Sequence, residues 1–267
     1  MTTTAQPVAD IAVIGGSGFY SFLDDPEERH VVTPYGAPSA PVSVGLVAGR
    51  RVAFLPRHGA HHDFPPHRIN YRANAWALRS LGVRQVLAPC AVGGLRPEVK
   101  PGDVVVPDQL VDRTLGRNQS FVETGAVHVP FADPYCQRLR DAVASVDDRI
   151  VRGGAMVVVE GPRFATRAES LHYAAQGWSL INMTGHPEAV LAREMRQCYA
   201  AIALVTDMDA GVEAGSGVGQ EEVFALFAAN LERLRGLLSD AIATLPDPDG
   251  CACSTWADGL ELTYEVP

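Results

Sequence analysis

Two aspartates, Asp207 and Asp209, follow the apolar run Ala201 to Val205 and are separated by a single residue. Residues two apart on an extended segment point to the same side, so both carboxyl groups face one site. Like charges at close range raise the pKa of one member, which can then deliver a proton. The alternative is a loop or helix-capping role, which is common for aspartate.

A glycine-rich turn follows the first apolar run, Ile11 to Ile14, and reads Gly-Gly-Ser-Gly with Ser17 as its hydroxyl residue. Glycines allow backbone N–H groups to approach an anion, which suits a phosphate. The three-glycine spacing of a dinucleotide-binding turn is missing, and Phe19 stands where its helix should begin. A plain tight turn remains the alternative.

Arg57 and His58 follow the apolar run Val52 to Leu55. A guanidinium fork beside an imidazole offers several donors to a phosphate, although a buried arginine is equally often part of a structural ion pair. More histidines follow in the same loop, but without the helical spacing of a zinc motif, so we expect no metal there.

Glu160, Phe164 and Met183 suggest a nucleoside site, because they offer a carboxylate, a ring that can stack on a base and a thioether that can lie against a sugar. Taken singly, Phe164 and Met183 are more often core residues.

The cysteines give no sign of a catalytic nucleophile or of a metal site. Cys90 has no base paired with it in the sequence and is interpreted as a small hydrophobic residue. Cys251 and Cys253 lack a histidine or a second cysteine pair, so we expect no structural metal. A sparse, odd number of cysteines favours a reduced, cytoplasmic compartment.

Elements that position these residues are visible as short apolar runs, which are typical of strands buried on both faces of a helix-covered sheet. The predicted strands are Ile11 to Ile14, Val42 to Val47, Val52 to Leu55, Gln85 to Ala88, Val104 to Val106, Met156 to Val159 and Ala201 to Val205.

Helices are predicted between these strands from capping signals and apolar stripes. They are Asn70 to Leu81, a helix opened by the capping box of Thr166 and Glu169, one over Ala189 to Met195, and Gln220 to Leu245. We therefore expect one α/β domain over residues 10–246. Residues 247–267 form a turn-rich tail of unknown role, either an edge strand or a cover for a neighbouring subunit.

Composition narrows the class of partner. The 267 residues are 47% hydrophobic and carry a formal net charge of −9, which disfavours binding to nucleic acid or an anionic membrane surface. No apolar run is long enough for a membrane span, and the start MTTTAQPVAD lacks the charged and apolar parts of an export signal. A small-molecule substrate is expected.

The order of the motifs is more specific than any one of them. The chain reads GGSGF, PRHG, NYRANAWAL, HVPFADPYC, EGPRFATRAES, INMTGHPEAVLARE and LVTDMDAG. In this order it resembles the trimeric purine nucleoside phosphorylase and methylthioadenosine phosphorylase family, from about Ile11 to Leu245. The resemblance implies a single α/β domain with a central twisted mixed β-sheet flanked by helices, assembled as a homotrimer.

The resemblance also implies roles for particular residues. Phosphate would be held by Ser17, Arg57, His58, Cys90, Ala91 and Thr184; the nucleoside would be bound by Phe164, Asn182, Met183, Asp207, Asp209, Val223 and His128. His128 would reach the 5′ pocket of the adjacent subunit, and Asp207 would be catalytic. Gln220 stands where the family has an apolar residue on the 5′ side.

The implied reaction is the phosphorolysis of 5′-methylthioadenosine to adenine and 5-methylthioribose 1-phosphate, with inorganic phosphate as co-substrate and no cofactor or metal. A phosphorylase acting mainly on adenosine or other purine nucleosides is the closest alternative. A nicotinamide-dependent oxidoreductase would need an acidic ribose anchor about twenty residues beyond the glycine turn. A non-catalytic nucleoside-binding protein would not need phosphate.

Overall fold

The computed structural model describes residues 7–210 and 218–267. Most of the amino-terminal segment considered for an export signal therefore lies outside the described residues.

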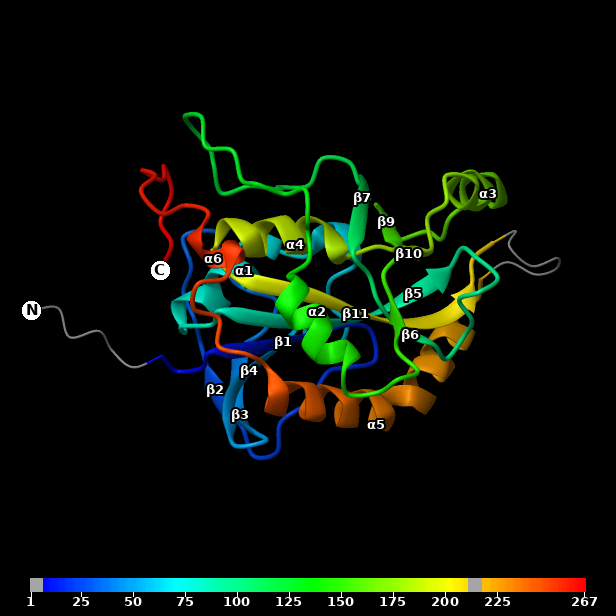
Figure 1. The fold of residues 1–267 in the computed structure, drawn as a ribbon, viewed down its shortest axis with the longest axis horizontal. Helices are drawn as coiled ribbons and strands as arrows, with labels where there is room; N and C mark the ends of the chain where they lie inside the picture. The colour runs from blue at the N-terminus through cyan, green and yellow to red at the C-terminus, as the bar shows by residue number, and fades with distance from the viewer. Residues whose placement is uncertain (1–6, 211–217) are drawn as a thin grey trace, which may run out of the picture.

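The core of the fold is an eleven-stranded mixed sheet (Figure 1). Its main path runs β2-β3-β4-β1-β5-β10-β9-β7, and β11 joins β5 to the pair β6-β8. The strands are β1 (Ile11–Gly15), β2 (Glu27–Arg29), β3 (Val42–Val47), β4 (Arg50–Pro56), β5 (Gln85–Gly94), β6 (Val104–Val106), β7 (Gln109–Arg113), β8 (Val151–Arg152), β9 (Ala155–Val159), β10 (Leu180–Asn182) and β11 (Cys198–Met208).

The sheet branches at β5. The first half of β5 lies between β1 and β11 and is parallel to both, whereas its last two residues pair antiparallel with β10 while still pairing with β11. The expected mixed sheet is thus present, and its branch point lies at the carboxyl end of its central strand.

Alternate residues of the strands enter two different hydrophobic cores. Ile11 and Val13 pack in the core on one face of the sheet, and Ala12 and Ile14 pack in the core on the other. Because both faces of β1 are buried, its sequence is continuously apolar rather than alternating. This explains why short apolar runs marked the strands.

Helices cover both faces. Helix α4 (Gly185–Glu194) lies on the upper side in Figure 1 and packs against α1 (Tyr71–Ser80), and the long α5 (Gln220–Thr244) lies along the lower side. Helix α2 (Gln137–Ala144), drawn in front of the sheet, contacts α5 and β11. Helix α3 (Arg167–Ala175) lies beyond β9 and β10. The capping box predicted for Thr166 and Glu169 is present at its start.

Two strands extend farthest beyond the predicted apolar runs. β5 continues from Ala88 through Pro89 and Cys90 to Gly94, and β11 continues past Val205 to Met208 with a bulge before Asp207. The two strands pair with each other along this whole length, so backbone hydrogen bonding extends them where the side-chain pattern stops. Asp207 is therefore a strand residue and not a loop residue.

The carboxyl-terminal segment packs on its own chain. After α5 it forms the short α6 (Ala252–Thr255) and no edge strand, so that part of the prediction is wrong. The Tyr264 hydroxyl donates to the carbonyl of Glu194 at 2.9 Å, and its ring stacks on Phe121. The segment is held by side-chain contacts, without a strand partner.

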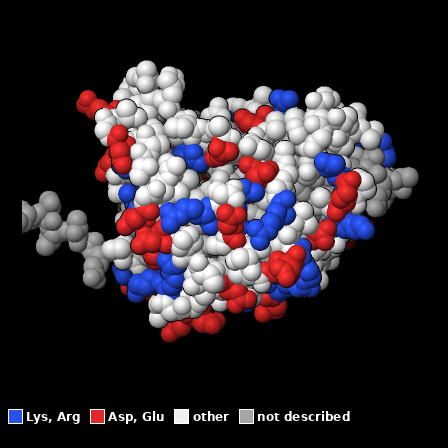
Figure 2. Space-filling model, viewed as in Figure 1, with Lys and Arg blue, Asp and Glu red and all other residues white. Residues whose placement is uncertain are grey.

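Acidic and basic side chains are interspersed on the face shown in Figure 2, without a broad basic patch. None of the helices in residues 7–210 and 218–267 has the length and hydrophobicity needed to cross a membrane.

Candidate active site

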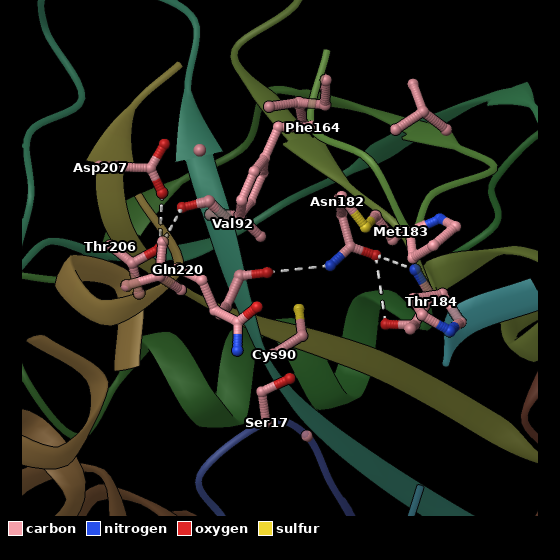
Figure 3. A pocket seen from close by; sticks show the side chains of 18 of the residues that line it. Ser17, Cys90, Val92, Phe164, Asn182, Met183, Thr184, Thr206, Asp207 and Gln220 are labelled. Atoms are coloured by element: carbon pink, nitrogen blue, oxygen red, sulfur yellow. Dashed lines mark hydrogen bonds between the residues drawn. The ribbon is translucent and has the colours of Figure 1, made fainter. Parts of the chain in front are cut away.

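A cavity of about 310 Å³ opens at the carboxyl ends of β1, β4, β5 and β11, next to the start of α5 (Figure 3). This is the sheet edge at which α/β proteins bind ligands, and the volume suits a small molecule. The site residues predicted from the sequence line it, except Glu160 and His128.

The two aspartates both lie close to Gly93. A Cβ atom at Gly93 would lie 3.1 Å from Asp207 Oδ1 and 3.2 Å from Asp209 Cβ. The absence of a side chain at Gly93 thus leaves room for both carboxyl groups at one end of the cavity, as their spacing predicted.

The carboxyl group of Asp207 has a raised pKa. Burial raises the pKa of this carboxyl group to about 6, with smaller contributions from Asp209 and Glu222. The Thr206 hydroxyl lies 2.8 Å from Asp207 Oδ2 and 3.3 Å from the carbonyl of Val92. Because a hydroxyl both donates and accepts, Thr206 can serve the ionised and the protonated form of Asp207 alike.

Asp209 is held from the opposite side. It is buried and accepts a short hydrogen bond from the Ser170 hydroxyl of α3, and its backbone N–H donates to the carbonyl of Gly94 at 2.9 Å. Burial raises its pKa, as it does for Asp207. The capping box thus positions the site, because it anchors the helix that supplies Ser170.

Arg57 lies at the other end of the cavity and is 1% exposed. Its Nε and Nη2 donate to the two carboxylate oxygens of Glu188 at 2.7 and 2.8 Å, and Tyr199 donates to the same carboxylate at 2.8 Å. The ion-pair alternative is therefore realised. Nη1 donates to the carbonyl of Pro89 at 3.3 Å and lies beside the glycine turn, 2.9 Å from where a Cβ of Gly16 would stand.

His58 is also buried, and its tautomer follows from one contact. Nδ1 lies 2.8 Å from the carbonyl of Phe64, which can only accept, so Nδ1 carries the proton. Burial and the charge of Arg57 lower its pKa to about 3. The neutral ring therefore offers Nε2 as an acceptor.

Asn182 makes three hydrogen bonds with protein backbone. Its Nδ2 donates to the carbonyl of Ala91 at 3.0 Å, and its Oδ1 accepts from the backbone N–H groups of Thr184 and Gly185 at 2.7 Å each. The amide thus fixes the junction of β5 and α4. Although Asn182 lines the cavity, its polar atoms bind protein backbone.

Phe164 and Met183 line the cavity, with Phe164 37% exposed and Met183 beside Asn182 in Figure 3. Glu160 does not line it. Its Oε2 accepts from Arg117 at 3.0 Å, and Arg117 also donates to the carbonyls of Met183 and His186. The suggested direct role of Glu160 is therefore wrong, because the carboxylate is paired within the wall that supports Met183.

Several lining residues were given no role at the site from the sequence, among them His62, Thr206 and Phe224. His62 stacks on His58 with ring centroids 4.4 Å apart, and Phe224 meets His62 edge to face at 5.9 Å. Phe224 follows Val223 on the first turn of α5, so its place next to a predicted site residue could have identified it from the sequence.

His128 is exposed and lies outside the cavity of its own chain. It belongs to the segment between β7 and α2 that extends from the body at the top of Figure 1. Its expected role at a neighbouring subunit stays a prediction.

Comparison with known proteins agrees with this architecture. Residues 10–243 match the family model described as the phosphorylase superfamily. The chain is 57% identical over 274 residues to a purine nucleoside phosphorylase of Streptomyces coelicolor, covering 97% of this chain and 98% of the relative. It is 55% identical over 258 residues to the S-methyl-5′-thioadenosine phosphorylase of Mycolicibacterium smegmatis, covering 96% and 99%.

A solved structure supports the same assignment. The methylthioadenosine phosphorylase of Schistosoma mansoni in complex with adenine aligns with a TM-score of 0.83 at 36% identity, over 88% of this chain and 91% of that one. With its family match and these full-length relatives, the chain belongs to the phosphorylase superfamily.

Proposed function

We propose that the protein cleaves 5′-methylthioadenosine with inorganic phosphate, releasing adenine and 5-methylthioribose 1-phosphate. The observation that carries the proposal is a cavity with two buried carboxyl groups of raised pKa at one end and a buried arginine and histidine at the other. Relatives named for this reaction share more than half of their residues with this chain.

At the phosphate end, Ser17, Arg57, His58, Cys90, Ala91 and Thr184 would surround the anion. Arg57 Nη1 and the glycine turn would supply donors, and Glu188 would hold the guanidinium in place. Neutral His58 would accept a hydrogen bond from a phosphate hydroxyl through Nε2. Phosphate is then a co-substrate, and the reaction requires no cofactor or metal.

At the base end, Asp207 would transfer its proton to purine N7 as the bond between the ribosyl carbon and N9 breaks. A phosphate oxygen forms the new bond to that carbon from the opposite face, and the leaving adenine keeps the electron pair of the broken bond. Asp209 would keep Asp207 oriented, and Phe164 and Met183 would lie against the base and the sugar.

The assembly proposed is a homotrimer in the cytoplasm. Exposed His128, outside its own cavity, supports a role at the 5′ end of the adjacent site. Val223 and Phe224 give the 5′ end of the cavity apolar surface that suits a methylthio group.

A phosphorylase that acts mainly on adenosine is the second candidate, favoured by one observation. Gln220 lines the cavity on the same helix turn as Val223 and can hydrogen-bond a 5′ hydroxyl group. The Streptomyces coelicolor relative is named a purine nucleoside phosphorylase.

The deciding experiment measures free adenine from methylthioadenosine and from adenosine, each with and without phosphate. We expect phosphate-dependent release from both, with the higher kcat/KM for methylthioadenosine. Release without phosphate would identify a hydrolase, and a preference for adenosine would establish the second candidate.

A further inference from the structure

Four cysteines from three distant parts of the chain gather at the sheet edge opposite the cavity. Cys136 precedes α2, Cys198 begins β11, and Cys251 and Cys253 lie at α6. All four are buried, and their sulfur atoms all lie within 4.8 Å of one another. The sequence-based premise that Cys251 and Cys253 have no second cysteine pair near them is therefore wrong.

The backbone around each thiol is fixed by other contacts. The N–H of Cys136 donates to the carbonyl of Tyr199, and that of Cys198 donates to the carbonyl of Arg84, both at 2.8 Å. The tail is held independently, because Arg196 Nε donates to the carbonyl of Ser254 and Arg138 donates to two carbonyls of the turn before Cys251. The four thiols are thus brought together on a prearranged scaffold.

The spacing of the sulfurs distinguishes a metal site from a disulfide. Cys136 Sγ and Cys251 Sγ are 3.7 Å apart. A disulfide requires about 2.0 Å. In a tetrahedral site with zinc–sulfur bonds of about 2.3 Å, neighbouring sulfurs are about 3.8 Å apart. The four buried sulfurs together make a complete ligand set for one tetrahedral metal ion.

We propose that Cys136, Cys198, Cys251 and Cys253 bind one Zn²⁺ ion as a closed tetrahedral site that ties the carboxyl-terminal segment to the domain. Each thiol loses its proton to solvent as its sulfur binds the metal, so the four thiolates and the ion together carry a net charge of −2. Cys90, the remaining cysteine, lies in the cavity and takes no part.

The site is structural rather than catalytic. Cys198 and Asp207 lie nine residues apart on β11, which places them about 30 Å from each other. Four protein ligands also leave no open position for a water molecule or substrate. Activity therefore does not report directly on the metal, and the test has to measure the metal itself.

The test uses the full-length protein expressed in zinc-supplemented medium and measures bound metal by mass spectrometry. We expect about one zinc per chain in the native protein and less than about 0.1 in the variant Cys251→Ser/Cys253→Ser. Cys90→Ser removes the one cysteine outside the cluster, and Ser254→Ala alters a buried residue of the same helix; both should retain the metal. Cobalt substitution should give the charge-transfer bands of a tetrahedral thiolate site.

Thiol counting after denaturation with a chelator and no reductant separates the alternatives. A zinc site leaves all five cysteines reactive, whereas two disulfides would leave one reactive thiol and would overturn the proposal. Five reactive thiols in a native protein that takes up neither zinc nor cobalt would overturn it as well. If the double variant does not fold, the metal content, cobalt spectrum and thiol count of the native protein still decide.

Discussion

At the scale of single residues, the proton on Asp207 is the feature most open to a direct test. Asp207→Asn should lower turnover of adenine nucleosides by about two to four orders of magnitude, the range typical of losing a general acid. Glu222→Gln is the matched control, because Glu222 influences Asp207 only through its charge and should have a small effect. Turnover unchanged in Asp207→Asn would remove Asp207 from its proposed role.

The same residue predicts the pH profile. Its pKa is raised to about 6, so the protonated form that donates is present below that pH and is lost as the pH rises through it. In the free enzyme, kcat/KM should therefore fall above about pH 6. In Asp207→Asn this decrease in kcat/KM should be absent, and the remaining pH dependence should come from phosphate and other groups. Measuring kcat/KM over a pH series for both proteins tests this.

Gln220 tests the choice between the two nucleosides. Replacing it by Val removes a group that can hydrogen-bond a 5′ hydroxyl, so the preference for methylthioadenosine over adenosine should increase about tenfold. Glu221→Gln, on the exposed side of the same turn, should leave the ratio of kcat/KM values unchanged. A ratio unaffected by Gln220→Val would place 5′ selectivity elsewhere.

Glu188 positions Arg57 and was not visible as a partner in the sequence. Glu188→Gln leaves a buried guanidinium without its counter-charge and should lower the free energy of unfolding by about 3 to 5 kcal/mol. The KM for phosphate should increase more than the KM for the nucleoside. Tyr199→Phe removes one hydrogen bond to the same carboxylate and should have a smaller effect on both quantities. Urea unfolding and steady-state kinetics measure them.

At the scale of elements, the junction of β5 and β11 shapes the base end of the cavity. Gly93→Ala would place a methyl group 2.9 Å from Ile181 Cγ2 and 3.1 Å from Asp207 Oδ1, so the strands or the carboxyl group must move. We expect a reduction in kcat of about tenfold or more. Gly236→Ala, in an exposed position of α5 with no atom within 4 Å of the new Cβ, should leave kcat unchanged. Equal kcat values in both variants would contradict this role of Gly93.

The same junction shows what can be predicted from sequence. Strands such as β1 and β6 are found from apolar runs, because burial on both faces selects their side chains. The carboxyl-terminal halves of β5 and β11 are not, since their extension depends on pairing between strands more than a hundred residues apart. The pairing of Glu188 with Arg57 and the gathering of the four cysteines likewise require tertiary structure.

At the scale of the whole molecule, the exposed position of His128 makes assembly testable. If His128 completes the neighbouring site, His128→Ala and Asp207→Asn should each be impaired as homotrimers. Co-refolding equal amounts should restore about a quarter of native activity, because random mixing gives each site an intact Asp207 and an intact neighbouring His128 with that probability. Refolding each variant alone is the control, and a fully active monomer in sedimentation experiments would rule the arrangement out.

Strand β5, at which the sheet branches, also spans the distance between the phosphate end and the base end of the cavity. Cys90, at the phosphate end, and Gly93, next to both aspartates, are three residues apart on it, a separation of about 10 Å. An extended strand that pairs with β11 along its whole length resists both stretching and compression, so the backbone sets the spacing between the phosphate end and the base end of the cavity. Substitutions at Phe164 or in the first turn of α5, which line the cavity without belonging to β5, can then change the substrate preference without altering that spacing.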